Sequence, residues 1–267
     1  MKSQNKVENN LSVPSQAQIK KWTRLADGKF RREEGLFTAE GVKVVAELLS
    51  SRRQTKAILL LPEKRRYWEK IIAKAPAEIP RYELTRAQWQ KISQDKEPEG
   101  IMALVAMTQE PFEVDYSTLA AGNTNTLILH EISNPGNLGA LMRSALWFDF
   151  ANIILSTGSV EYTHPKVVRT SMGSLFHLNI FADVRLKEAL PEIRKCCFLI
   201  GSDVRRGVAP HVLPKRAALL LGSESHGLPA DLLSIVDELW CIPGSGKVDS
   251  LSLPQAAAVL MYECAKK

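Results

Sequence analysis

Five short apolar runs in the second half of the chain constrain the fold more than any other feature. None of them alternates polar with apolar side chains. Strands that are apolar on both sides are covered on both faces, as in a parallel sheet between helices. The runs are "TLILH", "NIILS", "CFLIG", "ALLLG" and "LWCIP", and helical patterns lie between or after them at Leu138 to Trp147, Lys187 to Arg194, Pro229 to Val236 and Pro254 to Ala265.

The first half also alternates between helix and strand patterns. Helical spacing of apolar residues runs from Gln16 to Leu25 and recurs in "EGVKVVAELLS", "YWEKIIAKA" and "RAQWQKIS". The runs "AILLL" and "IMALVAM" predict buried strands. We therefore expect an α/β protein with a small α/β domain at 1–110, a linker at 111–125, and an α/β domain with a parallel sheet at 126–267.

The positive charge of the chain lies in its first half. Residues 1–112 hold 21 Lys and Arg against 14 Asp and Glu, a net +7, whereas residues 113–267 hold 14 against 15, a net −1. Basic segments of the first half are interleaved with Trp22, Phe30, Tyr67 and Trp68. This mixture can neutralise phosphates and stack bases. The alternative is a solvated helix face with a few half-buried aromatic residues.

Three strand ends in the second half are rich in glycine. They read "HEISNPGNLGALMRS", "LLLGSESHGLP" and "CIPGSGKVDSLSLP". Parallel sheets bind ligands at the carboxyl ends of their strands, and glycine lets the backbone approach a ligand closely. No G-x-G-x-x-G follows a strand, and "GSGKV" lacks the other residues of a P-loop, which disfavours dinucleotide and NTP sites. The histidines lack metal-ligand spacing, and no G-x-S-x-G elbow supports a serine hydrolase.

The first of these strand ends allows two interpretations. In the structural one, Pro135 and Gly136 form a turn, Asn137 caps a helix, and Arg143 lies on the solvated face of that helix. In the functional one, the asparagine and the arginine belong to a site at the strand end. The residues of this segment alone leave both open.

Taken in order, the three strand ends resemble the three motifs of the SpoU/TrmH branch of the SPOUT RNA methyltransferases. The matching stretches are "NPGNLGALMR", "LLLGSESHGL" and "IPGSGKVDSLSLPQAAAVLMYE". The segment "HPKVVRTSMGSLFHLNI" and the N-terminal "IKKWTRLADGKFRREEGLFTAEGVKVV" are also similar to the family. The resemblance implies an N-terminal, ribosomal-protein-like α/β domain that binds RNA. It also implies a C-terminal SPOUT α/β domain with a parallel sheet and a deep trefoil knot.

The resemblance further implies an enzyme that methylates a ribose 2′-hydroxyl of RNA with S-adenosylmethionine and without a metal. Ribosomal RNA is the expected substrate and tRNA the second choice. A homodimer through the C-terminal domain is also implied, and the last helix is apolar enough to lie in its interface. The four cysteines form no disulfide framework, which fits a cytoplasmic protein. The alternative from another class is a non-catalytic RNA-binding protein that retains the fold.

The site residues implied by the resemblance fall into two groups. Arg143 assists deprotonation of the ribose hydroxyl or holds the adjacent phosphate. For Glu224 there is an alternative to a role in the site, an ordinary carboxylate at the start of a helix before Pro229. The full catalytic group is Arg143, Asn137, Ser250, Ser252 and Glu224. The cofactor-binding group is Leu221, Gly222, Ser223, Gly227, Ile242, Pro243 and Leu251.

The third motif departs from the family pattern at two positions. Gly244 stands where the family usually has methionine, and Ser252 stands where it usually has an active-site asparagine. A serine offers one hydroxyl in place of the donor and acceptor pair of an amide. Cofactor binding is therefore a firmer expectation than catalysis.

Overall fold

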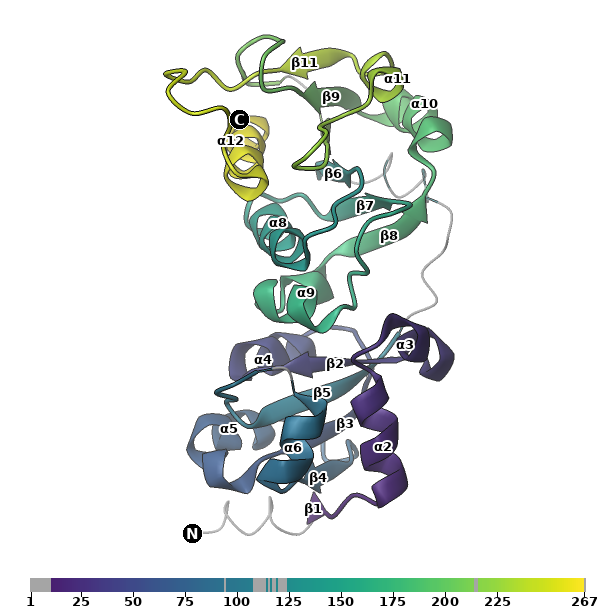
Figure 1. Cartoon of the computed structure of the whole chain (residues 1–267), viewed down its shortest axis with the longest axis vertical. Coiled ribbons are helices and arrows are strands. Elements are labelled where there is room, and N and C mark those ends of the chain that lie inside the picture. Colours follow the sequence, from purple (N-terminus) through teal and green to yellow (C-terminus); the bar gives the residue numbers. More distant parts are fainter. Residues whose placement is uncertain are drawn as a thin grey trace. The chain divides into compact units, whose positions relative to one another are not determined.

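The computed structural model describes residues 11–93, 95–107, 114, 116, 119, 124–213 and 216–266. The chain forms two compact units (Figure 1). The first comprises residues 1–108 together with 163–176, and the second comprises residues 109–162 and 177–267. Most of the predicted linker lies outside the described residues.

The first unit is built on a mixed sheet with the strand order β1-β4-β3-β5-β2. Strand β3 is parallel to β4 and antiparallel to β5, which in turn is antiparallel to β2. The strands are β1 (Leu11–Ser12), β2 (Leu36–Glu40), β3 (Thr55–Leu60), β4 (Arg81–Glu83) and β5 (Ile101–Ala106). Strands β1, β2 and β4 were not predicted. Strands β1 and β4 are only two and three residues long, and the threonine and glutamate of β2 interrupt the apolar pattern on which the strand predictions rested.

Helices cover this sheet and bury its aromatic residues. Ala57 and Leu59 of β3 share an apolar cluster with Trp22, and the same cluster holds residues of α2 and α6. Trp22 and Trp68 are buried, so the idea that they stack bases is wrong, and only Phe30 and Tyr67 remain for that role. The helices are α2 (Gln16–Arg24), α3 (Gly28–Glu34), α4 (Val42–Ser50), the 3₁₀ turn η1 (Pro62–Lys64), α5 (Arg65–Ile72) and α6 (Arg86–Ile92).

Residues 163–176 pack with the first unit, although the domain prediction placed them in the second domain. This segment contains α9 (Pro165–Thr170) and most of η2 (Ser174–His177). The ring of Phe176 stacks on that of Phe37 with 6.5 Å between centroids. Sequence patterns cannot reveal such a contact, because it joins residues that lie far apart along the chain.

The second unit is built on a sheet in which every described strand pair is parallel. Its strand order is β11-β9-β10-β6-β7-β8, which confirms the predicted parallel sheet. The strands are β6 (Thr126–Leu129), β7 (Asn152–Ser156), β8 (Asn179–Val184), β9 (Phe198–Ser202), β10 (Ala217–Leu221) and β11 (Glu238–Trp240).

Strand β8 was not predicted. It lies at the edge of the sheet, beyond β7, and its burial is mixed, with Asn179 exposed and Asp183 at a positive φ of 60°. The prediction relied on continuous apolar runs, which mark strands buried on both faces. An edge strand with polar residues does not have that pattern.

Two pairs of helices cover this sheet. Ile128, Ile154 and Leu220 share a cluster with side chains of α10 (Leu186–Cys196) and α11 (Ala230–Leu233). Helices α8 (Pro135–Trp147) and α12 (Leu253–Ala265) pack against each other and lie side by side in Figure 1. None of the described helices has the length and hydropathy of a membrane-spanning segment. The trefoil knot remains a prediction.

One buried carboxyl in the first unit predicts a pH dependence of stability. Glu40 accepts hydrogen bonds from Ser93 Oγ at 2.6 Å and Trp89 Nε1 at 3.3 Å. Burial raises the pKa of the Glu40 carboxyl above its ordinary value of 4.5, although these two hydrogen bonds oppose the rise. The folded state therefore holds this proton more tightly than the unfolded state does. Its contribution to stability is lost as the pH rises above about 4.5 toward the folded-state pKa.

We expect Glu40→Gln to remove this loss, because the amide oxygen still accepts a hydrogen bond and carries no charge. Urea unfolding of both proteins between pH 5 and pH 8 measures the effect. The variant should gain stability relative to the wild type as the pH rises. An equal loss of stability at every pH would contradict the prediction.

Candidate active site

The first and second glycine-rich loops leave the sheet side by side. Strand β10 pairs with β6 so that Leu221 lies opposite Leu129. The backbone N–H of His130 then donates to the carbonyl of Leu221 at 2.9 Å. Both strands end here, so this hydrogen bond joins the first residue of one loop to the last residue of the neighbouring strand.

The second loop closes back on itself immediately after β10. The N–H of Gly227 donates to the carbonyl of Ser223 at 2.9 Å, and Gly227 has a φ of 65°. A Cβ placed on Gly222 would lie 2.2 Å from the carbonyl carbon of Gly227. Only glycine fits at 222, because the opposing atoms belong to backbone. Leu221, Gly222, Ser223 and Gly227 thus form one small hairpin.

Asn137 and Glu224 connect the first loop to the second. The Asn137 side-chain amide donates to a carboxylate oxygen of Glu224. The predicted helix cap at Asn137 is wrong: Asn134 caps α8, accepting from the N–H groups of Gly136 at 2.8 Å and Asn137 at 3.3 Å. Since Asn134 satisfies the helix end, the side chain of Asn137 is left for Glu224. Glu224 lies in a turn and not at a helix start.

Arg143 lies on a different face of α8 from Asn137. They are six positions apart along the helix, which places them about 120° apart around its axis. Arg143 is exposed, and its guanidinium has no hydrogen-bond or ion-pair partner among the residues that the structure describes. Leu146 and Trp147, three and four residues further on, share its face. The structure therefore leaves Arg143 accessible but does not join it directly to the Asn137–Glu224 pair.

The third loop joins β11 to α12. Ile242 is partly buried, whereas Pro243 and the residues up to Ser252 are exposed. Ser252 is the N-cap residue of α12, and Ser250 and Leu251 directly precede it. The third loop ends at the start of α12, and α12 packs against α8, which contains most of the first motif.

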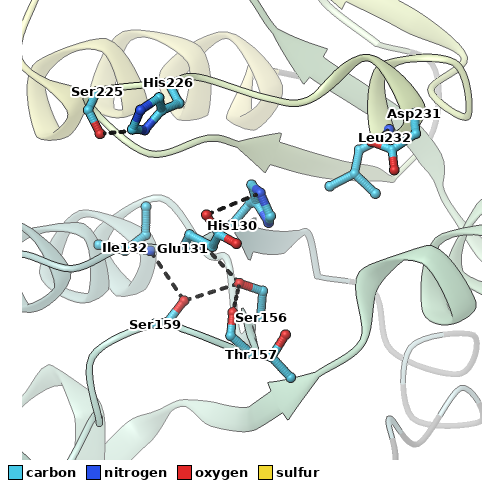
Figure 2. A network of polar contacts seen from close by, with 10 residues as sticks. All are labelled: His130, Glu131, Ile132, Ser156, Thr157, Ser159, Ser225, His226, Asp231 and Leu232. Atoms are coloured by element: carbon cyan, nitrogen blue, oxygen red, sulfur yellow. Dashed lines mark hydrogen bonds and ion pairs between the residues drawn. The ribbon is translucent and has the colours of Figure 1, made fainter.

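Two serines that were not among the predicted site residues hold the first loop (Figure 2). Ser156 Oγ accepts from the N–H of Glu131 at 2.8 Å and donates to the carbonyl of Thr157 at 2.8 Å. Ser159 Oγ accepts from the N–H of Ile132 at 3.2 Å. Glu131 has a positive φ of 51°, so these bonds stabilise an unusual backbone conformation. Nothing in the local pattern around either serine indicates this role.

A cavity of about 280 Å³ opens at the same edge of the sheet. Its rim holds balanced charge, because Lys187 Nζ lies 2.5 Å from an Asp231 carboxylate oxygen and Arg185 pairs with Glu188 at 3.5 Å. The hydrogen bond from Lys187 holds the pKa of Asp231 below its ordinary value. The lining residues are His130, Ser156, Thr157, Arg185, Leu186, Lys187, Glu188, Pro229 and Leu232.

The arrangement of three motif loops on a parallel sheet can be compared with known proteins. Residues 124–262 match the model of the SpoU rRNA methylase family. The chain belongs to this SpoU family. Residues 16–103 match the MRM3-like substrate-binding domain. The resemblance inferred from the three motifs and the expected α/β fold class are thus confirmed.

Relatives and solved structures are similar to this chain over nearly its whole length. The 23S rRNA (guanosine(2553)-2′-O)-methyltransferase RlmP of Bacillus subtilis is 27% identical over 247 residues, which cover 91% of this chain and 94% of RlmP. A TrmH-family structure from Porphyromonas gingivalis is 28% identical, with a TM-score of 0.80 over 94% of this chain and 98% of its own. The SpoU methyltransferase AviRb from Streptomyces viridochromogenes, solved with AdoMet, has the same fold. Its TM-score is 0.82 at 21% identity, over 94% of this chain and 97% of its own.

The tight hairpin after β10 predicts that Gly222→Ala destabilises the protein. The new methyl group would overlap the backbone of Gly227, so the loop must move. We expect the free energy of unfolding to fall by about 1–3 kcal/mol, as for other overpacked positions. Urea unfolding measures this loss.

Gly244→Ala is the matched control, because no atom beyond the adjacent residues lies within 4 Å of a Cβ at that position. Its stability should stay within about 0.5 kcal/mol of the wild type. Equal stability of the two variants would show that the hairpin accommodates a side chain.

Proposed function

We propose that this chain transfers the methyl group of S-adenosylmethionine to a ribose 2′-hydroxyl of ribosomal RNA. The observation that carries the proposal is that the motif loops of the SpoU family meet at one edge of the parallel sheet. Asn137 joins the first loop to Glu224 in the second, and the packing of α12 on α8 adds the third. Similarity to RlmP, which is named for 23S rRNA, supports ribosomal RNA over tRNA.

The residues of the second and third loops fit the cofactor. The third loop contains Leu251, whose side chain is 46% exposed, and the glycines Gly244 and Gly246. It therefore offers an apolar side chain and an accessible backbone in the same loop. An adenine ring requires an apolar surface with backbone donors and acceptors nearby. When bound, the cofactor supplies a methyl group already activated on a sulfonium. The residues that would hold it are Leu221, Gly222, Ser223, Gly227, Ile242, Pro243 and Leu251.

The catalytic residues act on the RNA more than on the cofactor. The Arg143 guanidinium is free to hold a phosphate next to the reacting ribose and to favour the charged form of its hydroxyl. Asn137 and Glu224 fix the positions of the first and second loops relative to each other. Ser250 and Ser252 lie directly before α12, where the Ser252 hydroxyl donates to Oε1 of Gln255. Alignment of the two reactants is the main catalytic contribution in this proposal.

The N-terminal domain provides most of the RNA affinity. Its charge is net +7 over residues 1–112, and cationic side chains lie over its accessible aromatic rings. The guanidinium carbon of Arg24 lies 3.5 Å from the centre of the Phe30 ring, and that of Arg66 lies 4.7 Å from the exposed Tyr67 ring. Such pairs contact phosphate and base together. We retain the domain limits 1–110 and 126–267 for this division of roles, with the linker at 111–125.

A second copy of the chain covers the apolar surface formed by α8 and α12. Trp147 is 83% exposed, and Leu146, Val259 and Tyr262 are also exposed on these two helices. The rings of Phe148 and Tyr262 lie 6.2 Å apart, so the end of α8 and the last turns of α12 form one continuous surface. Exposed apolar patches of this kind mark interfaces, and the homodimer implied by the family supplies the partner.

The activity is tested by incubating the purified protein with labelled S-adenosylmethionine and unmodified RNA. Transcripts of 23S rRNA and of tRNA provide separate arms of the experiment. We expect label on the ribosomal transcript, in a 2′-O-methylated nucleotide. Label on tRNA alone would replace the substrate, and RNA binding without any transfer would indicate the non-catalytic alternative.

Arg143→Ala tests the catalytic assignment. The guanidinium is exposed and makes no hydrogen bond or ion pair with a described residue. Its removal should therefore leave the free energy of unfolding nearly unchanged and the cofactor affinity within about twofold of the wild type. Methyl transfer should fall by at least about tenfold, as expected for an interaction made with the reacting group. Turnover and cofactor binding by calorimetry measure the two effects. Turnover within twofold of the wild type would remove Arg143 from the catalytic role.

Trp147→Glu tests the dimer. A carboxylate in an apolar interface is costly to bury, so we expect a monomer where the wild type is a dimer. Light scattering after size exclusion gives the mass of each. Val13→Glu is the control, because Val13 is an equally exposed apolar residue in the first unit. Loss of the dimer in both variants, or in neither, would contradict the assignment of the interface to α8 and α12.

A further inference from the structure

The start of α12 departs from a pattern that the chain follows at two other helices. Ser15 and Gln18 begin α2 with a capping box, in which the serine Oγ accepts from the Gln18 N–H at 3.2 Å and the glutamine Oε1 accepts from the Ser15 N–H at 2.8 Å. Thr85 and Gln88 do the same at α6, at 3.3 and 2.9 Å. Both pairs show what Ser/Thr-x-x-Gln ordinarily does at a helix start.

Ser252 and Gln255 have the same spacing at α12 but form a different interaction. Ser252 is the N-cap residue, yet its hydroxyl makes no bond to the helix backbone. It donates instead to Oε1 of Gln255 at 2.9 Å. Pro254 lies between them and has no N–H to offer a cap. The capping bonds that stabilise α2 and α6 are thus absent from the described start of α12.

The hydrogen bond between Ser252 and Gln255 leaves the NH₂ group of the Gln255 side chain available. The carbonyl of Gln255 is occupied by the serine hydroxyl, whereas its NH₂ group keeps two N–H donors that have no partner among the described residues. Both residues are exposed. Local rules that a chain obeys elsewhere are most often broken at functional sites. Here the break lies next to Ser250 and Leu251, within the third motif of the SpoU site.

We propose that the amide of Gln255, held in place by Ser252, contacts the RNA in the active site. This inference rests on the proposed methyl transfer. Because the carbonyl is engaged, the NH₂ group donates to an oxygen of the substrate nucleotide, in its ribose or phosphate. Ser252 is then a positioning residue that acts through Gln255. Together the two side chains provide what a single asparagine at 252 would provide, an amide donor next to Leu251.

The experiment compares turnover, KM for RNA and cofactor affinity among variants of the full chain. Gln255→Ala should lower turnover by about ten- to a hundredfold, as for a lost hydrogen bond to a reacting or charged group, with cofactor affinity unchanged. Gln255→Glu should be at least as poor, because a carboxylate has no N–H and repels phosphate. Ser252→Ala should lose less, since the amide stays but is no longer held.

Rescue separates this role from a structural one. Combining Ser252→Asn with Gln255→Ala should restore turnover to within about tenfold of the wild type, because the new asparagine carries its own amide. A merely structural Gln255 would not be rescued in this way. Gln88→Ala is the matched control. It breaks a formed capping box and should lower the melting temperature by a few degrees, whereas Gln255→Ala should leave it nearly unchanged.

The outcomes distinguish this inference from the proposed function. If the wild type transfers methyl groups and Gln255→Ala does so at the same rate, the role of Gln255 is overturned and the function stands. If Gln255→Ala loses both turnover and melting temperature and is not rescued, the glutamine is structural and the inference falls. If the wild type transfers no methyl group to either RNA, the proposed function and the role of Gln255 fail together.

Discussion

Strand β10 is hydrogen-bonded to β6 on one side and to β9 on the other, and both neighbours run parallel to it. All three strands therefore end at the same edge of the sheet. The carbonyl of Leu221 accepts from the N–H of His130 at this edge, which fixes the starting points of two loops together. The contact between Asn137 and Glu224 builds on this, with Glu224 three residues beyond the end of β10 and Asn137 eight residues beyond the end of β6. An antiparallel β10 would have separated these side chains by the length of the strand.

The strand ends impose their geometry on the loops to different degrees. The first loop is held by the sheet, because Ser156 at the end of β7 accepts from the N–H of Glu131. The second loop is held by its own backbone, because Gly227 leaves no room for a side chain at Gly222. The third loop is exposed up to Ser252 and depends on α12 to direct it. Since α12 packs on α8, the position of this helix relates the third motif to the first.

The sequence was sufficient for features that depend on local pattern. Continuous apolar runs predicted the buried parallel strands, since burial on both faces leaves a direct signature. They failed for β8, where an edge position permits polar residues such as Asn179 and Asp183. Interleaved aromatics suggested base stacking, yet Trp22 and Trp68 are buried, because the positions on the core side of α2 and α5 were not known from the sequence.

Within the candidate site, local sequence preferences leave open which contacts form. The spacing of Ser252 and Gln255 fits a capping box, and only the structure shows that the two side chains bind each other instead. One interpretation of the sequence placed the helix cap at Asn137, whereas Asn134 forms it, because two asparagines three residues apart are equally good caps. The choice between them depends on Glu224, which reaches Asn137 only after the chain has folded. Residues with the same local preference thus acquire different roles through contacts that lie far away in the sequence, and Gln255 differs from Gln18 and Gln88 for the same reason.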